Sequence, residues 1–291
     1  YNSGNDKKPN MDTSLKYPKT NAVEIKDKSL TWWAQADYNF KERYYLSASA
    51  GLAASSRFGE KSEGAINMFG VPWGFFPSVS AAWVATSEPW FKVDFIDYLK
   101  FNVGYDLTGN DGYDATASKT YFSPVKVLGK TGLAMANIGN GSLRWETTSK
   151  LTAGLVMNLL DNRLSLSANM FSSTTDNLLS VGSIAYVTGL PQTWSNGGSL
   201  SNKGFDASFN AKLISSPMVQ WELGASIGHY KNEITKLPTA GYDTEMYGAT
   251  IRTEVGKPLG VFYGYETDGL FLTSEAAQAA GLYMRSNTGV R

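Results

Sequence analysis

The sequence predicts an all-β fold, namely a segment of an antiparallel transmembrane β-barrel with about eight or more strands. Three observations predict it. Stretches of roughly ten residues alternate apolar with polar side chains, which places the two kinds on opposite faces of a strand. Short connections alternate with long polar ones along the chain. No stretch approaches the roughly 18 consecutive apolar residues of a membrane-spanning helix.

The first predicted hairpin lies near the beginning of the chain. Ala34–Phe40 and Tyr44–Leu52 each carry an apolar side chain at every second position, and the charged residues Lys41–Arg43 lie between them. Further along, Lys100–Thr108 alternates in the same way. In each strand one face suits lipid and the other suits water.

Two further hairpins share this design, with alternation on both strands and a short polar turn between them. Asp161 and Asn162, residue types that favour turns, join the first pair. The strands are Leu151–Leu159 with Leu164–Met170, and Phe205–Leu213 with Val219–Gly228 beyond the turn Ser215–Pro217.

The connections differ in length at the two ends of the predicted sheet. In bacterial barrels the short turns face the periplasm and the long loops face the outside. Aromatic residues such as Trp32 and Trp90 lie near strand ends, where their rings suit the lipid headgroup level. The expected periplasmic set is Lys41–Arg43, Leu160–Arg163, Ser215–Pro217 and the longer Ser87–Asp97; the expected extracellular set is Ser56–Trp73, Gly109–Ser142, Asn177–Leu200 and Asn232–Thr250.

Composition excludes several classes of function. The 26 basic residues equal the 26 acidic ones, and no basic stripe with interleaved aromatics occurs, so we expect no nucleic-acid binding. Cysteine is absent, which excludes disulfides and thiolate metal sites. His229 is the single histidine, which excludes a histidine-rich metal cluster. We expect neither a cofactor nor a metal.

The two ends of the chain suggest an interior part of a longer polypeptide. The beginning shows no charged and then apolar export signal, and the end shows no terminal strand. We expect residues 1–29 to be a polar lead-in within an extracellular loop and residues 30–271 to form the barrel segment. Residues 272–291 are expected to be a loop or the start of the next extracellular segment.

A series of short motifs follows the chain in order. They are Ser55–Gly59, Trp73–Trp83, Leu99–Asn110, Leu143–Thr148, Asn162–Leu164, Thr175–Leu179, Asn196–Asp206, Gly256–Tyr265 and Asp268–Leu270. Together they resemble the barrel of SusC/RagA-type TonB-dependent outer-membrane transporters of Bacteroidetes, over about Leu30–Phe271. One departure is visible, because Ala53 and Ala54 stand where that family usually carries an Asp-Gly pair.

The resemblance implies a larger assembly. Members are similar in having an N-terminal plug inside a barrel of about 22 strands, of which this chain would supply part of the wall. It also implies a bacterial outer-membrane location, contact with TonB through the N-terminal part of the parent chain, and a SusD-like lipoprotein over the mouth. The implied activity is import of oligosaccharides or peptides, both of which remain open, and not enzymatic catalysis.

Two other functions compete with transport. A soluble all-β carbohydrate-binding module would also show alternation, but it would bury its apolar rows between two sheets. A purely structural or adhesive barrel would share the membrane wall but lack transport. The alternation of short and long connections favours a membrane wall over the soluble module.

Tyr186 and Trp194 are the candidate ligand contacts, since aromatic faces can stack on sugar rings. Both lie in the long connection Ser180–Leu200, where packing within the loop is the competing and favoured interpretation. Asn110–Asp114 offers several oxygens, but its spacing departs from the EF-hand loop and no distal glutamate follows. That stretch therefore predicts a turn.

No catalytic residues are predicted. His229 is expected to end a strand near the extracellular rim, and no Gly-x-Ser-x-Gly motif accompanies it. Glu146, Asp206 and Glu222 could pair as the acid and nucleophile of a glycosidase. Charges scattered over the water-facing wall are the favoured interpretation of these carboxylates.

Overall fold

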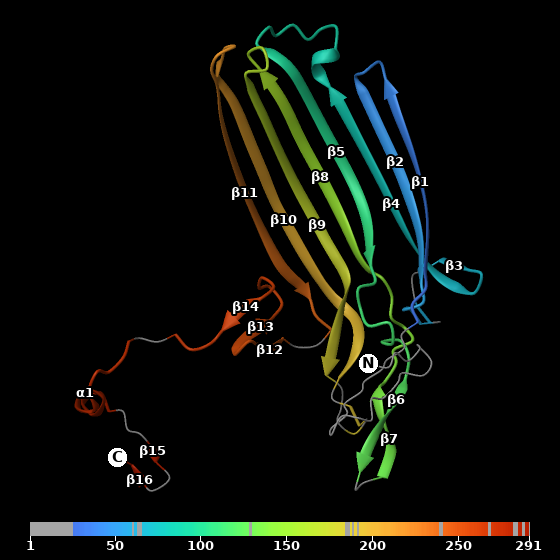
Figure 1. Ribbon diagram of the computed structural model, residues 1–291, viewed down its shortest axis with the longest axis vertical. Helices are drawn as coiled ribbons and strands as arrows, with labels where there is room; N and C mark the ends of the chain where they lie inside the picture. The colour runs from blue at the N-terminus through green and yellow to red at the C-terminus, as the bar shows by residue number, and fades with distance from the viewer. Residues whose placement is uncertain are drawn as a thin grey trace, which may run out of the picture.

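The computed structural model describes residues 26–59, 61–62, 66–127, 130–183, 187, 189–190, 192–238, 241–266, 269–281, 285–286 and 289–290. Its main feature is an antiparallel sheet in which each strand pairs with the next in the order β1-β2-β4-β5-β8-β9-β10-β11 (Figure 1). The short strand β3 pairs beside β4. These strands are β1 Ser29–Phe40, β2 Tyr44–Ser55, β3 Ile66–Met68, β4 Val71–Val84, β5 Ile96–Asn110, β8 Glu146–Leu159, β9 Leu164–Ser183, β10 Gln192–Ser215 and β11 Gln220–Lys236. The predicted all-β antiparallel wall is confirmed.

Smaller elements occupy the connections and the end of the chain. The hairpin of β6 and β7 lies between β5 and β8, and a three-stranded sheet, β12-β13-β14, follows β11. No helix among the described residues is long and apolar enough to cross a membrane. The bounds are η1 Ala85–Ser87, β6 Tyr121–Val127, β7 Lys130–Asn137, β12 Tyr242–Met246, β13 Ala249–Thr253, β14 Val261–Tyr263, α1 Ser274–Ala279, β15 Arg285–Ser286 and β16 Gly289–Val290.

The short connections lie at one end of the sheet, uppermost in Figure 1, and the long ones at the other. Between β1 and β2 the amide of Arg43 donates to the carbonyl of Phe40 at 3.1 Å. The two central residues of that turn have φ of 55° and 57°. Asp161 and Asn162 adopt the same left-handed φ between β8 and β9. Such turns match the twist of antiparallel strands, and the three predicted hairpins are confirmed.

Strand register divides the sheet into two faces. We call them the apolar face and the polar face, because successive side chains of a strand point to opposite sides. One row of the apolar face runs Phe40, Tyr44, Trp83, Phe101, Leu155, Ala168, Ala207, Ile227. One row of the polar face runs Gln35, Ser49, Ser78, Asp106, Lys150, Ser173, Asn202, Asn232.

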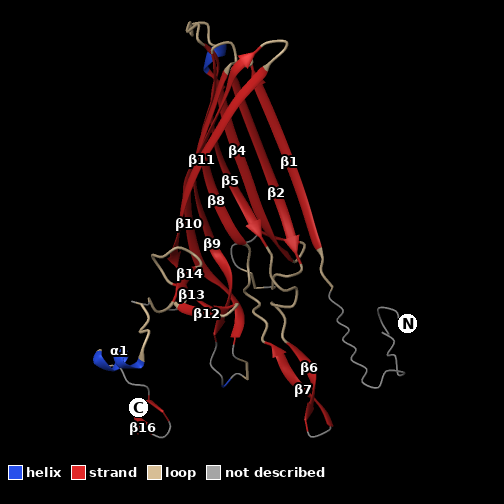
Figure 2. Ribbon diagram, turned by 60° about the vertical axis from the view of Figure 1, so that its left-hand side comes forward, coloured by secondary structure: helices blue, strands red, loops and turns tan. Residues whose placement is uncertain are grey.

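The apolar face is open to the surroundings. Figure 2 shows the sheet as a single layer, and no second sheet covers this face anywhere in the described part of the chain. Met170 and Ile227 are 65% and 66% exposed. A soluble sandwich would bury such rows, whereas a barrel wall presents them to lipid.

The alternation pattern misses β4. This strand contains Pro72 and Pro77, and proline inside a run argues against a central strand. Pro77 lies opposite Ala50 of β2, while the ladder between β4 and β5 begins only at Ser78. The missing N–H of Pro77 therefore falls outside the ladder with β5.

Two sequence-based expectations are wrong in detail, and a third is incomplete. The long loop expected over Asn177–Leu200 is mostly strand, because β9 continues to Ser183 and β10 begins at Gln192. The expected long connection Gly109–Ser142 is present, and it contains the β6–β7 hairpin, which the sequence pattern did not predict. His229 does not end a strand; it lies inside β11 opposite Phe205 on the apolar face, with ring centroids 6.4 Å apart. In β9, β10 and β11 the backbone ladder continues where the apolar alternation has stopped.

Candidate ligand-contact surface

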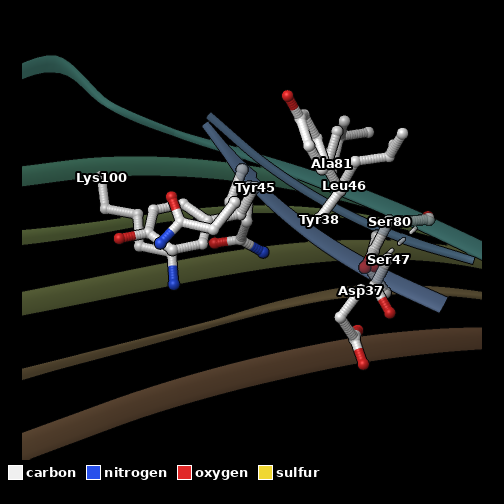
Figure 3. A pocket seen from close by; sticks show the side chains of 14 residues that line it. Asp37, Tyr38, Tyr45, Leu46, Ser47, Ser80, Ala81 and Lys100 are labelled. Carbon is white, nitrogen blue, oxygen red and sulfur yellow. Dashed lines mark hydrogen bonds between the residues drawn. The ribbon is translucent and has the colours of Figure 1, made fainter. Parts of the chain in front are cut away.

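The polar face contains a hollow of about 560 Å³ over β1, β2, β4, β5 and β8. Asp37, Tyr45, Lys100 and Asn102 supply a carboxylate, a phenol, an ammonium group and an amide to its lining. Figure 3 shows Asp37 pointing to this side of the sheet, while Tyr38 on the same strand points to the other. The Lys100 ammonium lies 5.8 Å from the centre of the Tyr45 ring. This combination can donate and accept hydrogen bonds to a hydroxyl-rich or amide-rich ligand.

A second hollow of about 460 Å³ lies on the same face over β8 to β11. Its polar lining consists of uncharged hydroxyl and amide side chains, among them Ser167, Ser208 and Asn210. The hydroxyls of Ser167 and Ser208 lie 2.7 Å apart, and Asn169 Nδ2 donates to Asp206 Oδ2 at 2.9 Å. These short contacts hold the side chains in place along the wall.

At the long-loop end of the sheet, five aromatic rings form a continuous chain. Successive ring centroids are 5.2, 4.6, 5.6 and 6.1 Å apart. A Cβ at Gly109 would overlap the first ring, so a glycine is required there. The rings belong in order to Phe76, Trp145, Phe58, Tyr113 and Trp194. This aromatic chain links the polar face to the loops that follow β2 and β5 and to the beginning of β10.

The aromatic chain encloses a small buried core. Phe58 and Tyr113 are 7% and 5% exposed, and the fully buried Leu143 belongs to the same cluster. Burial raises the pKa of the Tyr113 phenol well above its ordinary range. The Tyr113 hydroxyl has no hydrogen-bond partner among the described residues. Desolvation without a partner costs free energy, so packing and not hydrogen bonding stabilises this core.

Of the two candidate ligand contacts, Trp194 lies at the end of the aromatic chain. Its side chain is half-buried against the core, and its carbonyl accepts a hydrogen bond from Asn140 Nδ2 at 3.0 Å. Tyr186 lies outside the described residues. Trp194 lies in β10 and packs against the loop residues of this core, and a role of either ring in ligand contact stays a prediction.

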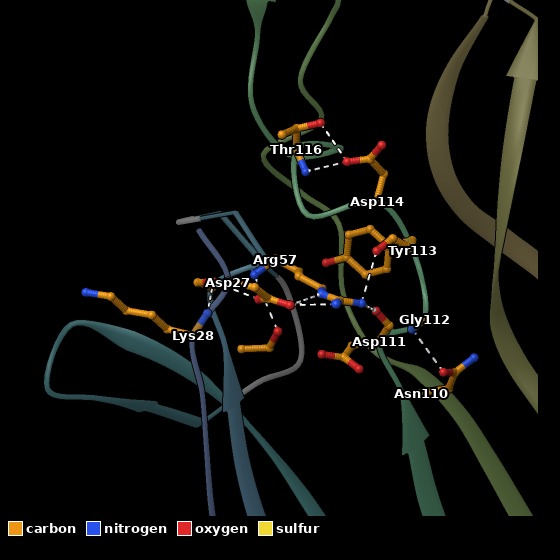
Figure 4. Close-up of polar contacts among 11 residues, drawn as sticks. Asp27, Lys28, Arg57, Asn110, Asp111, Gly112, Tyr113, Asp114 and Thr116 are labelled. Atoms are coloured by element: carbon orange, nitrogen blue, oxygen red, sulfur yellow. Dashed lines mark hydrogen bonds and ion pairs between the residues drawn. The ribbon is translucent and has the colours of Figure 1, made fainter. Parts of the chain in front are cut away.

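Arg57 connects three segments beside this core (Figure 4). Its Nε donates to Asp27 Oδ2 at 2.7 Å, and its Nη1 donates to the carbonyls of Asp111 and Tyr113 at 3.0 and 3.1 Å. The hydrogen bond from Arg57 lowers the pKa of Asp27 below its ordinary value. The sequence motif contains Arg57, but nothing local to it predicts partners 30 and 54 residues away.

Asn196 of β10 likewise connects the segment before β8 with β9. Its Oδ1 accepts from the amide of Arg144 at 3.0 Å, and its Nδ2 donates to the carbonyls of Arg144 and Asn177. The register of β10 shifts between Asn196 and Gly198. The side chain therefore satisfies backbone groups that the ladder leaves free at this irregularity.

The structure confirms the turn predicted at Asn110–Asp114. Asn110 Oδ1 accepts from the amide of Gly112 at 2.9 Å, and Asp114 Oδ1 accepts from the amide and hydroxyl of Thr116. These hydrogen bonds lower the pKa of Asp114. Across the described residues, no group of three or more His, Cys, Asp or Glu is placed to hold a metal ion.

The three carboxylates considered for glycosidase chemistry lie far apart. Asp206 is opposite Gly228, which is six residues from Glu222 on β11, about 20 Å along the strand. Glu146 lies at the long-loop end of β8, where its Oε2 accepts from the amide of Leu179 at 3.1 Å. Glycosidase carboxyl groups are about 5–10 Å apart, so these residues do not form such a pair.

Comparisons with known proteins agree with this architecture. The family described as "TonB dependent receptor-like, beta-barrel" matches residues 1–275. TonB-dependent receptor P39 of Formosa agariphila is 31% identical over 247 residues, which cover 84% of this chain and 22% of that protein. TonB-dependent receptor SusC of Bacteroides thetaiotaomicron is 29% identical over 236 residues, covering 78% and 22%. The chain thus spans about a quarter of the length of the curated relatives it matches.

A solved structure shares the fold. The structure of the RagAB peptide transporter superimposes with a TM-score of 0.73 at 23% identity, covering 88% of this chain and 27% of that one. At this identity the match establishes likeness of fold. The long strands, their order and the single-layer sheet therefore have a counterpart in a protein determined by experiment.

Proposed function

This chain belongs to the TonB-dependent receptor-like β-barrel family, and from that premise we propose that it forms part of the wall of a SusC-like outer-membrane nutrient transporter. In this proposal the apolar face contacts outer-membrane lipid and the polar face lines the interior. The short turns face the periplasm and the long loops face the outside. Family members are receptors and transporters, so the chain is proposed to carry no catalytic step.

The observation that carries the proposal is the single-layer sheet with two chemically different faces. Apolar rows this exposed favour a lipid environment, because their exposure to water would cost a large free energy. On the opposite face, hydroxyl, amide and charged groups border hollows of about 560 and 460 Å³. A wet chamber with many hydrogen-bonding groups suits the transit of a large polar nutrient.

We propose oligosaccharides or peptides as the nutrient, and a SusD-like surface lipoprotein as the partner at the long-loop end. The uncharged hydroxyls of the second hollow suit sugar hydroxyls, whereas Asp37 and Lys100 of the first suit the charged groups of a peptide. The plug, the TonB contact and the remaining strands are proposed to come from the parent protein. Sequence similarity to SusC supports this assignment.

Two experiments on the full-length protein test the proposal. Purification from the outer membrane in detergent, followed by mass spectrometry, is expected to recover a surface lipoprotein in a fixed ratio. Calorimetric titration with defined oligosaccharides and with defined peptides then identifies the nutrient class. Detergent-free solubility would favour the soluble carbohydrate-binding module, and a lipid-embedded protein that takes up neither nutrient would favour the structural barrel.

A further inference from the structure

Two lysines lie directly opposite each other on the apolar face. Lys203 of β10 pairs in register with Lys231 of β11, and this is the next pair on the apolar face beyond Phe205 and His229 toward the long loops. Both lysines are exposed, with the Lys231 side chain at 73%. Like charges directly opposite on a sheet repel, so the sequence places an unfavourable pair at the border of the apolar rows.

Nearby acidic groups compensate this pair incompletely. Glu233 contacts Lys231 at 3.3 Å, but no acidic side chain in the described part of the chain pairs with Lys203. Asp176 lies further toward the loops on the same face, where its carboxylate accepts from the hydroxyl of Ser199. The two lysines and Glu233 together therefore carry one positive charge that is not compensated.

An apolar hollow of about 380 Å³ begins on the same face, toward the short-turn end. Small residues create it, since Ala168, Ala207 and Ala225 lie among the larger Phe209 and Ile227. Within β10, Ala207 lies four residues from Lys203, which is about 13 Å along the strand. Charge and hollow are thus aligned along the two neighbouring strands β10 and β11 seen in Figure 1.

We propose that this strip of the outer wall binds a phosphorylated lipid of the outer leaflet. The phosphate lies between the ammonium groups of Lys203 and Lys231 and relieves their repulsion, as lysines commonly bind phosphate. One acyl chain occupies the apolar hollow, where each buried methylene group adds to the affinity. A free phosphate ion would leave the hollow empty, which is why a lipid is the assigned ligand.

The orientation of the wall agrees with this assignment. Lys203 and Lys231 lie 12 and 11 residues from the short-turn ends of their strands, and the apolar rows lie between them and the short turns, so in the proposed orientation the lysines are on the outer side. Basic side chains at this border face lipid headgroups. The inference rests on the proposed membrane orientation, but it is independent of the transported nutrient.

The test uses the full-length protein in detergent, titrated with lipid A that carries its phosphates and observed by native mass spectrometry. The double variant Lys203→Gln/Lys231→Gln is expected to weaken binding by about 30-fold, because each lysine near an anionic headgroup contributes appreciably. The matched control Lys150→Gln/Lys212→Gln removes the same charge from the polar face and is expected to leave lipid binding unchanged. Unaltered thermal unfolding verifies that both variants fold.

A second arm separates the two parts of the site. Ala207→Phe fills the hollow without altering charge and is expected to weaken lipid A binding, while Lys203→Arg/Lys231→Arg is expected to retain it. Dephosphorylated lipid A is expected to bind weakly. Inorganic phosphate at the same concentration as phosphorylated lipid A is expected not to displace that lipid. Equal binding of the phosphorylated and dephosphorylated lipids, or of wild type and the double glutamine variant, would overturn the proposal. Intact nutrient binding in those variants would leave the transport proposal standing.

Discussion

At the scale of single residues, the fit between Phe76 and its glycine neighbours decides how the loops attach to the sheet. The Phe76 ring lies where a Cβ on Gly74 or Gly109 would have to be. It contacts Trp145 edge to face, which begins the aromatic chain toward Trp194. Glycine is therefore needed for close packing and not for a turn at these two positions.

Gly109→Val is expected to destabilise the full-length protein by about 1–3 kcal/mol, since an overpacked site must shift its neighbours. Phe76→Ala in the same chain removes the overlap and is expected to recover part of the loss. Gly224→Val is the control, because its nearest neighbour is the carbonyl of Phe209 at 3.7 Å. Thermal unfolding of the wild type, the two single variants, their double variant and the Gly224→Val control measures the coupling. Additive effects of Gly109→Val and Phe76→Ala would contradict the packing account.

A second residue-scale prediction concerns pH. Arg57 lowers the pKa of Asp27. The stabilisation from the ion pair between Asp27 and Arg57 is therefore fully present above the ordinary pKa of 3.8, and it is lost as the pH falls through the lowered pKa. Hydrogen exchange at the amides of Lys28 and Ser56, which are hydrogen-bonded across this contact, is expected to accelerate in that acidic range. Asp27→Asn should show the faster exchange at neutral pH, without that dependence. A wild-type profile that matches the variant at every pH would refute this.

At the scale of elements, the turn between β8 and β9 depends on left-handed backbone. Asn162 has φ of 58°, and its amide donates to Asp97 Oδ2 at 2.9 Å. Asn162→Val is expected to lower the free energy of unfolding by about 1–2 kcal/mol, because a β-branched residue is strained at this φ. Asn162→Gly accepts the same φ and serves as the control, since both variants lose the side-chain contact with Asn158. The free energies of unfolding of the two variants and the wild type are compared by folding each protein into micelles at a series of urea concentrations.

The same scale explains what the sequence could predict. Alternation predicts the strands wherever one face is apolar and the other polar, and all three predicted hairpins have this pattern. The outer parts of β9 and β10 have polar residues on both faces, so the ladder continues there without a pattern. In β4, two prolines make the sequence atypical of a paired strand, although the strand is paired. Composition alone could not distinguish these parts from loops.

Contacts between distant segments were beyond the reach of sequence patterns. Asn196 lies in a recognisable Asn-Gly-Gly motif, yet its partners Arg144 and Asn177 belong to other strands or turns. The packing of Trp194 depends on Tyr113, 81 positions earlier in the chain. Residue type indicated an aromatic contact at Trp194, and only the fold identifies the neighbouring ring.

At the scale of the whole molecule, the sheet is an open wall. Its first and last strands, β1 and β11, each pair on one side within the described residues. All of β1 is exposed, and Trp32 is 66% exposed on its apolar face. Unpaired strand edges and exposed apolar rows both promote association between chains. A closed barrel would remove the edges, and lipid would cover the rows.

Residues 1–291 expressed alone are therefore expected to aggregate in detergent-free buffer and to form mixed oligomers in detergent, through pairing of β1 with β11 of another copy. Sedimentation velocity with and without detergent measures both states, and the full-length protein in the same detergent is the control, since its remaining strands are proposed to close the wall. Substituting lysine for exposed apolar residues of β1, such as Trp32 and Leu30, should reduce association in buffer. A monodisperse, detergent-free monomer of the unaltered chain would contradict the assignment of the apolar face to lipid, because such a monomer must bury those rows within itself.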